Sequence, residues 1–274
     1  MPAQRRSDFR HLADRAWFAR VLAPLLVGVV LVVSWQAICR GFQVPRYLVP
    51  APTDVVDSFI AHMPMLLASL QSTMEVTFKA FGLAVVIGTF AAFLFVQSRF
   101  AEVGIFPYVV LLQVTPIVAI APLIIILVKS TSLALVICAT LVALFPIISN
   151  TVTGLRSVDP GLLSYFKMKK AGRLQTLVRL RIPSALPFFL AGLRISSGLS
   201  LIGAVVAEFV AGTGGRSAGL AYQILEAGFR LDIPLMFAAL VLIALLGIAM
   251  FLAMTALTQA LLGHWHESAL RESR

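Results

Sequence analysis

Long apolar runs separated by short polar segments dominate the hydropathy pattern of this chain. Six runs come near the roughly 20 residues that a helix needs to cross a bilayer. They cover residues 21–39, 68–97, 104–128, 131–153, 184–211 and 234–262, approximately. Leu, Val, Ile, Ala and Phe follow one another in these runs without the period of two that marks a membrane β-barrel. The pattern predicts an all-α membrane protein of about six transmembrane helices.

The composition supports one helical membrane domain. Of the 274 residues, 59% are hydrophobic and only 12% are charged, and the mean hydropathy is +0.96. We expect a tail at 1–20, a membrane domain at 21–262 and a second tail at 263–274. A secretory signal is an alternative for the first run, but Asp8 and Asp14 precede it and no small-x-small cleavage site follows. We therefore interpret that run as a retained helix.

The basic residues indicate the orientation, because they favour the cytoplasmic side of a membrane. A cytoplasmic N-terminus puts fifteen of them inside and five outside. Those inside are Arg5, Arg6, Arg10, Arg15, Arg20, Arg99, Arg156, Lys167, Lys169, Lys170, Arg173, Arg179, Arg181, Arg271 and Arg274; those outside are Arg40, Arg46, Lys129, Arg216 and Arg230. Both termini are thus expected in the cytoplasm. This bias accounts for much of the net charge of +10, so we expect no nucleic-acid partner.

Enzymatic or metal chemistry has no candidate in the sequence. The four histidines, His11, His62, His264 and His266, all fall outside the predicted spans, and Cys39 and Cys138 are interpreted as small apolar residues. The glycine-rich "GTGGRSAG" at 212–219 lacks the Gly-Lys-Ser/Thr ending of a phosphate-binding loop and is interpreted as a turn. We expect no catalytic residue, no metal and no bound cofactor, and any ATP must be used by a separate protein.

A few charged residues fall within the spans. Glu75 and Lys79 are four residues apart and should pair on one helical face. Arg194 should extend to the cytoplasmic interface. Glu208 has no basic residue one turn away, and an ionisable group at such depth is a functional candidate. The alternative is a helix-end acid that accepts hydrogen bonds from the backbone.

Two proline-containing segments should interrupt regular structure. Pro116 and Pro122 lie inside the third span, where each removes a backbone donor, so that helix should bend or unwind. It is a candidate pathway wall, with a simple packing kink as the alternative. On the outer side, residues 41–63 should form an extended connection and a short helix that is capped by Thr53 or Asp54 and ends before Pro64.

The segment between the fourth and fifth spans is strongly basic. Asp159 should cap a helix that starts at Pro160, and Gly172 should break or bend it. One side of this helix carries Leu162, Leu163 and Phe166, and another carries Lys167, Lys170 and Arg173. Its charge excludes it from hydrocarbon. Periodicity leaves two interpretations open, a helix on anionic membrane lipid or a docking helix for a cytoplasmic partner.

Several motifs resemble, in order, the membrane subunit of bacterial binding-protein-dependent ABC importers, in the branch that handles nitrate, taurine and sulfonates. They are "STMEVTFKAFGLAVVIGT", "TPIVAIAPL", "LFPIISNTVTGLRSVDPGLL", "RLRIPSALPFFLAGLRISSGLSLIGAVVAEFVAG", "GLAYQI" and "PLMFAALVLIALLGIAMF". The resemblance implies the type I importer permease fold in the bacterial inner membrane. It also implies a homodimer that works with a cytoplasmic ABC ATPase and a periplasmic or lipid-anchored solute-binding protein.

The same resemblance makes residues 160–182 the coupling helix that contacts the ATPase. The residues expected to carry this role are Leu163, Phe166, Lys167, Lys170, Ala171, Gly172, Arg173 and Gln175. The family's Glu-Ala-Ala and glycine signature would fall on Ser164, Tyr165, Phe166 and Lys170, where none of it is kept. Ala80 also stands where glycine is usual, whereas Gly88 is retained. The departure from the Glu-Ala-Ala and glycine signature concerns the details of the ATPase contact.

The resemblance implies a small organic solute or anion as the cargo. Sulfonates, taurine and nitrate are one class, and thiamine-pyrimidine precursors and riboflavin are another, which the "GLAYQILEAGFRLDIPLMFAAL" portion resembles equally well. Glu208 is characteristic of this branch, which suggests an outer gate or passage role. A secondary transporter without an ATPase is the alternative function. It would predict inverted repeats and more ionisable groups within the membrane.

Overall fold

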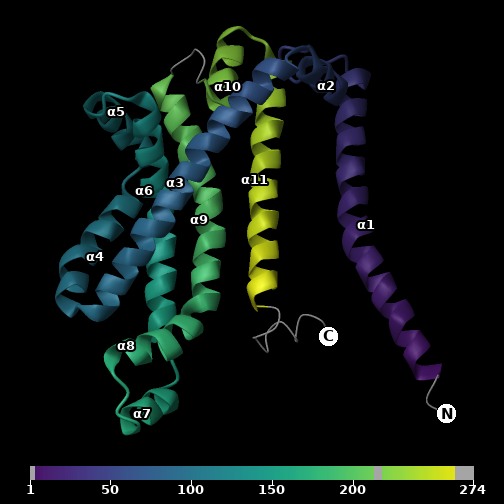
Figure 1. Ribbon diagram of the computed structural model, residues 1–274. Coiled ribbons are helices and arrows are strands. Elements are labelled where there is room, and N and C mark those ends of the chain that lie inside the picture. Colours follow the sequence, from purple (N-terminus) through teal and green to yellow (C-terminus); the bar gives the residue numbers. More distant parts are fainter. Residues whose placement is uncertain (1–3, 213–217, 263–274) are drawn as a thin grey trace. The chain divides into compact units, whose positions relative to one another are not determined.

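The computed structural model describes residues 4–212 and 218–262, and within these ranges the chain folds into helices without strands (Figure 1). The described residues divide into two compact units. One comprises the chain up to residue 63 together with residues 227–238, and the other comprises residues 64–226 and the chain from residue 239 onward. The all-helical prediction is confirmed.

The first unit contains α1, Gln4–Gly41, and α2, Pro52–Ala61. The predicted capping of α2 by Thr53 or Asp54 is wrong. Ala51 is the N-cap and Pro52 takes the first helical position, because proline has no N–H to satisfy there. The Asp54 carboxylate instead accepts a hydrogen bond from the Ala51 N–H at 3.1 Å. The helix does end before Pro64, as predicted.

Two arginines stabilise the connection between α1 and α2 by ion pairs. Arg40 and Arg46 both contact the buried Asp54 carboxylate, at 3.1 and 3.2 Å. Gln36 also hydrogen-bonds both the hydroxyl and the backbone N–H of Thr53, each at 3.2 Å. These contacts join the end of the first apolar helix to the short helix that follows it.

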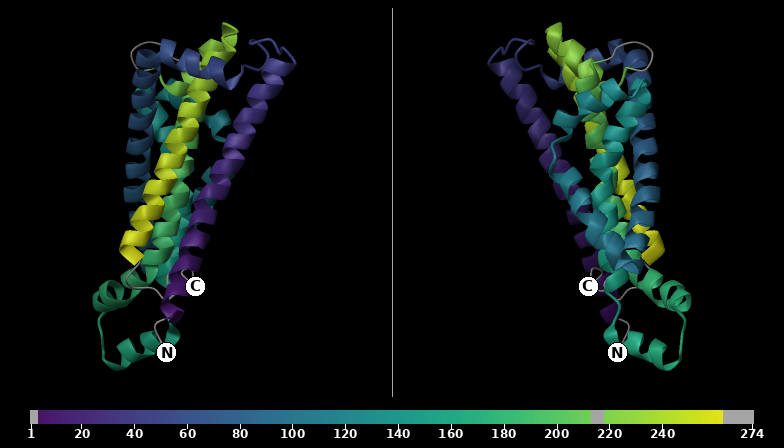
Figure 2. Two further views of the ribbon diagram at one scale, coloured as in Figure 1. Left: turned by 90° about the vertical axis from the view of Figure 1, so that its right-hand side faces the viewer. Right: turned by 90° about the vertical axis from the view of Figure 1, so that its left-hand side faces the viewer.

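The second unit holds most of the remaining helices. They are α3, Met63–Gln97; α4, Arg99–Val114; α5, Ile117–Leu127; α6, Thr131–Arg156; and α9, Ile182–Ala211. Helix α10, Leu220–Phe229, begins in this unit, and its residues from Ala227 onward belong to the first. The last helix, α11, Ile233–Leu262, begins in the first unit and continues in the second. Between α6 and α9 the chain forms α7, Pro160–Met168; α8, Arg173–Thr176; and a π-helix, Leu177–Arg181. Figures 1 and 2 show α7 and α8 beyond the ends of α6 and α9.

Five helices in the described part of the chain are long and apolar enough to cross a membrane, and the spans number up to six if the bent pair of α4 and α5 is counted as one. The third predicted span, 104–128, is therefore not one helix. It begins earlier, at Arg99, and bends by 104° between α4 and α5. The expected interruption occurs at Pro116, whereas Pro122 lies inside α5 without breaking it.

Small residues bring α6 and α9 close together. A Cβ atom added to Gly203 would lie 2.8 Å from the Ala139 Cα, and one added to Gly192 would lie 3.0 Å from the Pro146 carbonyl oxygen. The Ser196 hydroxyl donates to the Ala143 carbonyl at 2.7 Å across the same interface. Such close backbone approach is how membrane helices gain packing energy.

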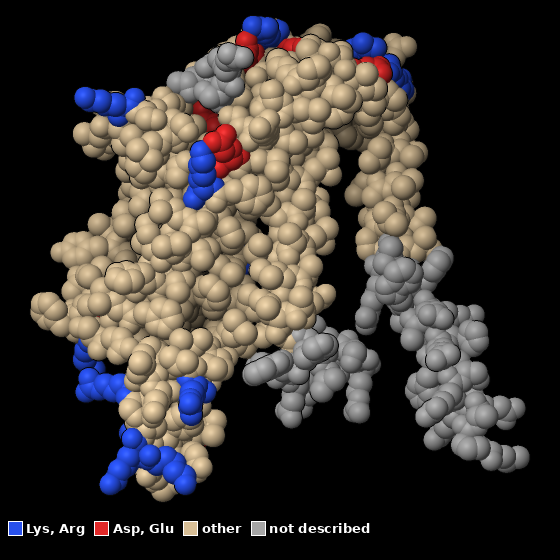
Figure 3. All heavy atoms as spheres, viewed as in Figure 1, with Lys and Arg blue, Asp and Glu red and all other residues tan. Residues whose placement is uncertain are grey.

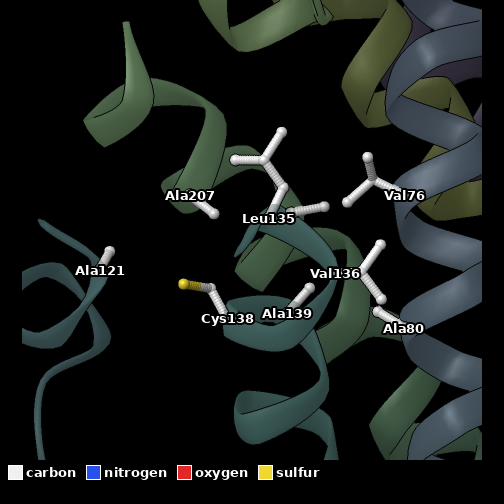
Figure 4. Packing of buried hydrophobic residues seen from close by; sticks show 9 residues of the cluster. Val76, Ala80, Ala121, Leu135, Val136, Cys138, Ala139 and Ala207 are labelled. Atoms are coloured by element: carbon white, nitrogen blue, oxygen red, sulfur yellow. The ribbon is translucent and has the colours of Figure 1, made fainter. Parts of the chain in front are cut away.

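A buried apolar cluster continues this interface towards α3 and α5. Its members are Val76, Ala80, Ala121, Leu135, Val136, Cys138, Ala139, Ala204 and Ala207, several of which Figure 4 labels. Ala80 is fully buried. Both cysteines are buried and free, in agreement with their interpretation as small apolar residues.

Candidate functional site

The segment between α6 and α9 folds as two short helices joined by a tight turn. The Asp159 carboxylate accepts a hydrogen bond from the Leu162 N–H at 3.0 Å, and Pro160 occupies the first helical position, as predicted. The break, however, is not centred on Gly172, which has an ordinary φ of −64° and serves as the N-cap of α8. The left-handed residue is Lys170, with φ +53°.

The conformation of Lys170 has a local cause. The Ala171 N–H donates to the Phe166 carbonyl at 3.0 Å, which closes the end of α7 around the left-handed residue. Only glycine adopts this conformation without steric cost. By the resemblance described above, the signature glycine would fall on Lys170. The backbone geometry that favours glycine is present at this lysine.

The predicted coupling residues gather on this segment with differing exposure. Leu163, Phe166 and Ala171 are half-buried, whereas the remaining predicted residues, Lys167, Lys170, Gly172, Arg173 and Gln175, are exposed. The Gln175 side chain accepts a hydrogen bond from the Gly172 N–H at 3.2 Å and so helps to cap α8.

Sequence reasoning missed three apolar residues of the segment. Tyr165, Met168 and Leu174 are 50%, 74% and 72% exposed. Lys169 places its ammonium group 5.8 Å from the centre of the Tyr165 ring. The sequence feature that could have revealed them is the presence of apolar residues within short helices that are otherwise basic. Their exposure makes this a surface suited to contact with another protein.

The segment continues directly into α9. Residues 173–211 form one uninterrupted helical stretch, in which a π-helical turn at Leu177–Arg181 precedes α9. Within this turn only Leu180 is buried. Because there is no loop between α8 and α9, a displacement of the short helices can pass directly into a membrane-spanning helix.

The break between α4 and α5 lines a cavity of about 310 Å³. Its walls include Gln113, Thr115, Pro116, Ile120, Val142 and Leu199. The Thr115 hydroxyl donates to the Leu111 carbonyl at 2.7 Å, and its backbone N–H donates to the same oxygen at 3.0 Å. No charged side chain is among the lining residues in the described part of the chain. Gln113, which sequence analysis did not single out, is the longest polar side chain of this wall.

Glu208 lies buried where α3, α9 and α10 meet. It is only 4% exposed. One carboxylate oxygen accepts from the Thr73 hydroxyl at 3.1 Å and from the Ala221 N–H at 3.2 Å. The Thr73 hydroxyl in turn accepts from the Leu220 N–H at 2.9 Å. A Cβ atom on Gly219 would overlap the Glu208 carboxyl group, so any larger residue there would displace that carboxyl from its hydrogen-bond partners.

These contacts fit the expectation of a helix-end acid that accepts a backbone hydrogen bond. The hydrogen bonds of Glu208 go to α3 and α10 and not to the α4–α5 break. The second carboxylate oxygen is buried without a partner among the described residues. Sequence analysis missed Thr73 and Gly219, whose role depends on contacts between distant parts of the chain. The role of Glu208 in transport stays a prediction.

The other charged residues of the spans are also engaged. Glu75 and Lys79 form the predicted ion pair. The Arg194 guanidinium lies 4.6 Å from the centre of the Phe251 ring, a cation–π contact. A bidentate pair that sequence analysis did not predict joins Glu102 of α4 to Arg156 of α6, at 2.8 and 2.7 Å.

Part of the sequence analysis concerns residues outside the described ranges. Residues 213–217 of the glycine-rich turn, and His264 and His266, belong to this part. Gly212, with φ +55°, ends α9 in the left-handed conformation that glycine favours. Within residues 4–212 and 218–262, no three His, Cys, Asp or Glu side chains gather as metal ligands would.

Comparison with known proteins agrees with this architecture. The model of the family described as "Binding-protein-dependent transport system inner membrane component" matches residues 84–263. A probable ABC transporter permease of Haemophilus influenzae is 32% identical, with 85% of this chain and 93% of the relative covered. The formylaminopyrimidine transport permease of Halalkalibacterium halodurans is 31% identical, with 89% and 96% covered. The riboflavin transport permease of Chloroflexus aurantiacus is also 31% identical, with 94% and 95% covered.

A solved structure shows the same fold. The crystal structure of an amino acid ABC transporter with histidines superposes with a TM-score of 0.60 at 20% identity, and covers 74% of this chain and 95% of that one. These matches leave no support for the alternative of a secondary transporter. The chain belongs to the family of inner membrane components of binding-protein-dependent transport systems.

Proposed function

We propose that this ABC importer permease works in the bacterial inner membrane as a homodimer, with both termini in the cytoplasm. Two cytoplasmic ABC ATPase subunits and a periplasmic or lipid-anchored binding protein would complete the importer. The family match supports these kinds of partner. The excess of basic residues on one side of the predicted topology supports the orientation.

The ATPase would contact α7 and α8. These helices contain no buried residue of their own, yet they present apolar and basic side chains together. Movement of the ATPase on ATP binding and hydrolysis would displace this segment. The uninterrupted helix from Arg173 to Ala211 would carry the displacement into the membrane. There the attached helices would move, so that the pathway opens alternately to the inside and the outside.

The cavity at the α4–α5 break is the observation that carries our proposal for the solute. It offers the Gln113 amide and apolar walls, with no charged lining residue in the described chain. An anion without a charged partner is costly in such a place. An uncharged heterocycle can stack on apolar walls and hydrogen-bond to an amide. We therefore place thiamine-pyrimidine precursors and riboflavin before sulfonates, taurine and nitrate.

The relatives agree with this order. The formylaminopyrimidine and riboflavin permeases are each 31% identical. The putative aliphatic sulfonate permease of Bacillus subtilis is 29% identical and covers 81% of this chain, less than either of them.

Uptake into proteoliposomes tests the proposal. The chain would be reconstituted with its ATPase and binding protein, and ATP-dependent uptake of formylaminopyrimidine, riboflavin and taurine would be compared. We expect uptake of a heterocycle, with a roughly tenfold loss in Gln113→Leu if one buried hydrogen bond is removed. The control Gln43→Leu changes an exposed glutamine outside the cavity. Uptake of taurine alone would contradict the proposed solute class.

A further inference from the structure

A second cavity lies between the cytoplasmic end of α3 and the α7–α8 turn. Its volume is about 400 Å³. The residues that define its character are Val96, Gln97, Leu163, Lys167, Arg173 and Arg181. It is separate from the cavity at the α4–α5 break, with which it shares no lining residue.

The charge of this cavity is uncompensated. Lys167, Arg173 and Arg181 line it, and no acidic residue does. None of the three has an ion pair with an acid in the described part of the chain. The sequence contains no Asp or Glu between Pro160 and Ala207. Figure 3 shows Lys and Arg gathered around α7 and α8 without acidic side chains among them on that face. Three cations around one hollow attract an anion.

The walls of the cavity are apolar as well as basic. Val96, Leu163 and Leu177 line it together with the cations. Val96 and Gln97 end α3, a helix that is long and apolar enough to cross the membrane. The cavity therefore lies where that span ends, which is the depth of lipid head groups. Cations beside apolar walls at this depth suit an amphiphile with an anionic head.

We propose that this cavity binds the phosphate group of an anionic membrane phospholipid. Arg181 is the central ligand, because it is half-buried whereas Lys167 and Arg173 are exposed, and because a guanidinium can donate two parallel hydrogen bonds to a phosphate. Lys167 and Arg173 add positive charge from the α7–α8 turn, and Val96, Leu163 and Leu177 contact the apolar part of the lipid. The bound lipid would thereby join the end of α3 to the segment proposed to contact the ATPase. Free inorganic phosphate shares the anionic chemistry but makes no use of the apolar wall.

The site has a matched control on the same helical turn. Arg179 lies two residues from Arg181, is exposed and does not line the cavity. Arg181→Gln and Arg179→Gln remove the same charge at nearly the same depth. A general attraction to an anionic surface would respond equally to both changes, whereas the proposed site responds to one.

Native mass spectrometry of the purified full chain tests the proposal. The protein would be incubated with phosphatidylglycerol, with phosphatidylcholine, or with phosphatidylglycerol and excess inorganic phosphate. We expect retention of phosphatidylglycerol over phosphatidylcholine, unchanged by inorganic phosphate. Binding should be at least about tenfold weaker in Arg181→Gln, because the charge and at least one of the two charge-assisted hydrogen bonds are lost, and unchanged in Arg179→Gln. Arg181→Lys should be intermediate, because it keeps the charge without the planar fork.

Three results would overturn the site. They are equal retention of both lipids, equal weakening in both arginine variants, and displacement of the lipid by inorganic phosphate. If Arg181→Gln does not yield a monodisperse protein, Lys167→Gln takes its place, with Lys169→Gln as its control because Lys169 does not line the cavity. No ATPase is present in this experiment, so its failure leaves the proposed importer function untouched.

Discussion

The α6–α9 interface and the α7–α8 segment lie next to each other in the sequence but are stabilised in opposite ways. In the interface, glycine and serine allow two backbones to touch, and the contacts are complete within the chain. In the segment, α7 and α8 bury no residue, and apolar side chains such as Met168 and Leu174 remain exposed. The first region is fixed by its own packing. The second is shaped by caps and a turn, and its surface is left exposed.

The largest effect is expected from crowding the α6–α9 interface. Gly203→Val would force a side chain against the Ala139 backbone, and overpacking of this kind costs roughly 1–3 kcal/mol or more. We expect a strong loss of folded protein and a lower Tm by a thermal-shift assay in detergent. Gly198→Val is the control, because a Cβ atom at Gly198 of the same helix meets nothing within 4 Å. Equal losses in the two variants would contradict close packing at Gly203.

A substitution in the exposed α7–α8 segment should affect ATPase binding and leave the stability of the fold almost unchanged. Leu174→Asp places a charge on a residue that is 72% exposed, so Tm should change little. ATPase binding should fall by at least about tenfold, because an apolar contact is replaced by a charge at the interface. Phe229→Asp is the control, since Phe229 is 81% exposed and lies on the predicted outer side. Pull-down of the ATPase subunit measures both variants, and a similar loss in Phe229→Asp would refute a localised contact.

Glu208 is buried and polar, and so differs from both regions. Glu208→Gln keeps a carbonyl oxygen that can accept from Thr73 and Ala221, so we expect normal protein levels with impaired uptake. Wild-type uptake in this variant would remove the Glu208 charge from the mechanism.

The fit around Glu208 is tested separately. Gly219→Ala should reduce the free energy of unfolding by about 1–3 kcal/mol, and so lower Tm, because its methyl group would overlap the Glu208 carboxyl. The matched change Gly228→Ala has room for the methyl group and should leave Tm nearly unchanged. An unaltered Tm in Gly219→Ala would show that the junction of α3, α9 and α10 is looser than the structure indicates.

The smallest effects concern the ion pairs. Glu75→Gln breaks a pair whose two side chains are more than half exposed. The free energy of unfolding should fall by less than about 0.5 kcal/mol, so Tm should hardly change. Glu102→Gln breaks a bidentate pair between α4 and α6 and should lower Tm more, because bidentate geometry strengthens the contact. Thermal-shift measurements rank the two, and the reverse order would contradict this assignment.

Hydropathy predicted the spans well because the length and apolarity of a membrane helix are local properties of the sequence. Proline also marked the interruption at Pro116, although not the 104° angle, which depends on how α4 and α5 pack against the rest of the unit. The turn at Lys170 could not be predicted, because a lysine rarely adopts a left-handed backbone. Thr73 and Glu208 are 135 residues apart, and no local pattern reveals such a contact.

Co-purification tests most directly whether α7 and α8 form the proposed ATPase contact. The full chain would be purified in detergent with its ATPase subunit, as wild type and with Lys167, Lys169, Lys170 and Arg173 changed to alanine. We predict that the wild type retains the ATPase and that the variant, with an unchanged Tm, loses it. Equal retention by both would contradict a contact that depends on these basic residues, and a wild type that binds no ATPase would contradict the proposed coupling altogether.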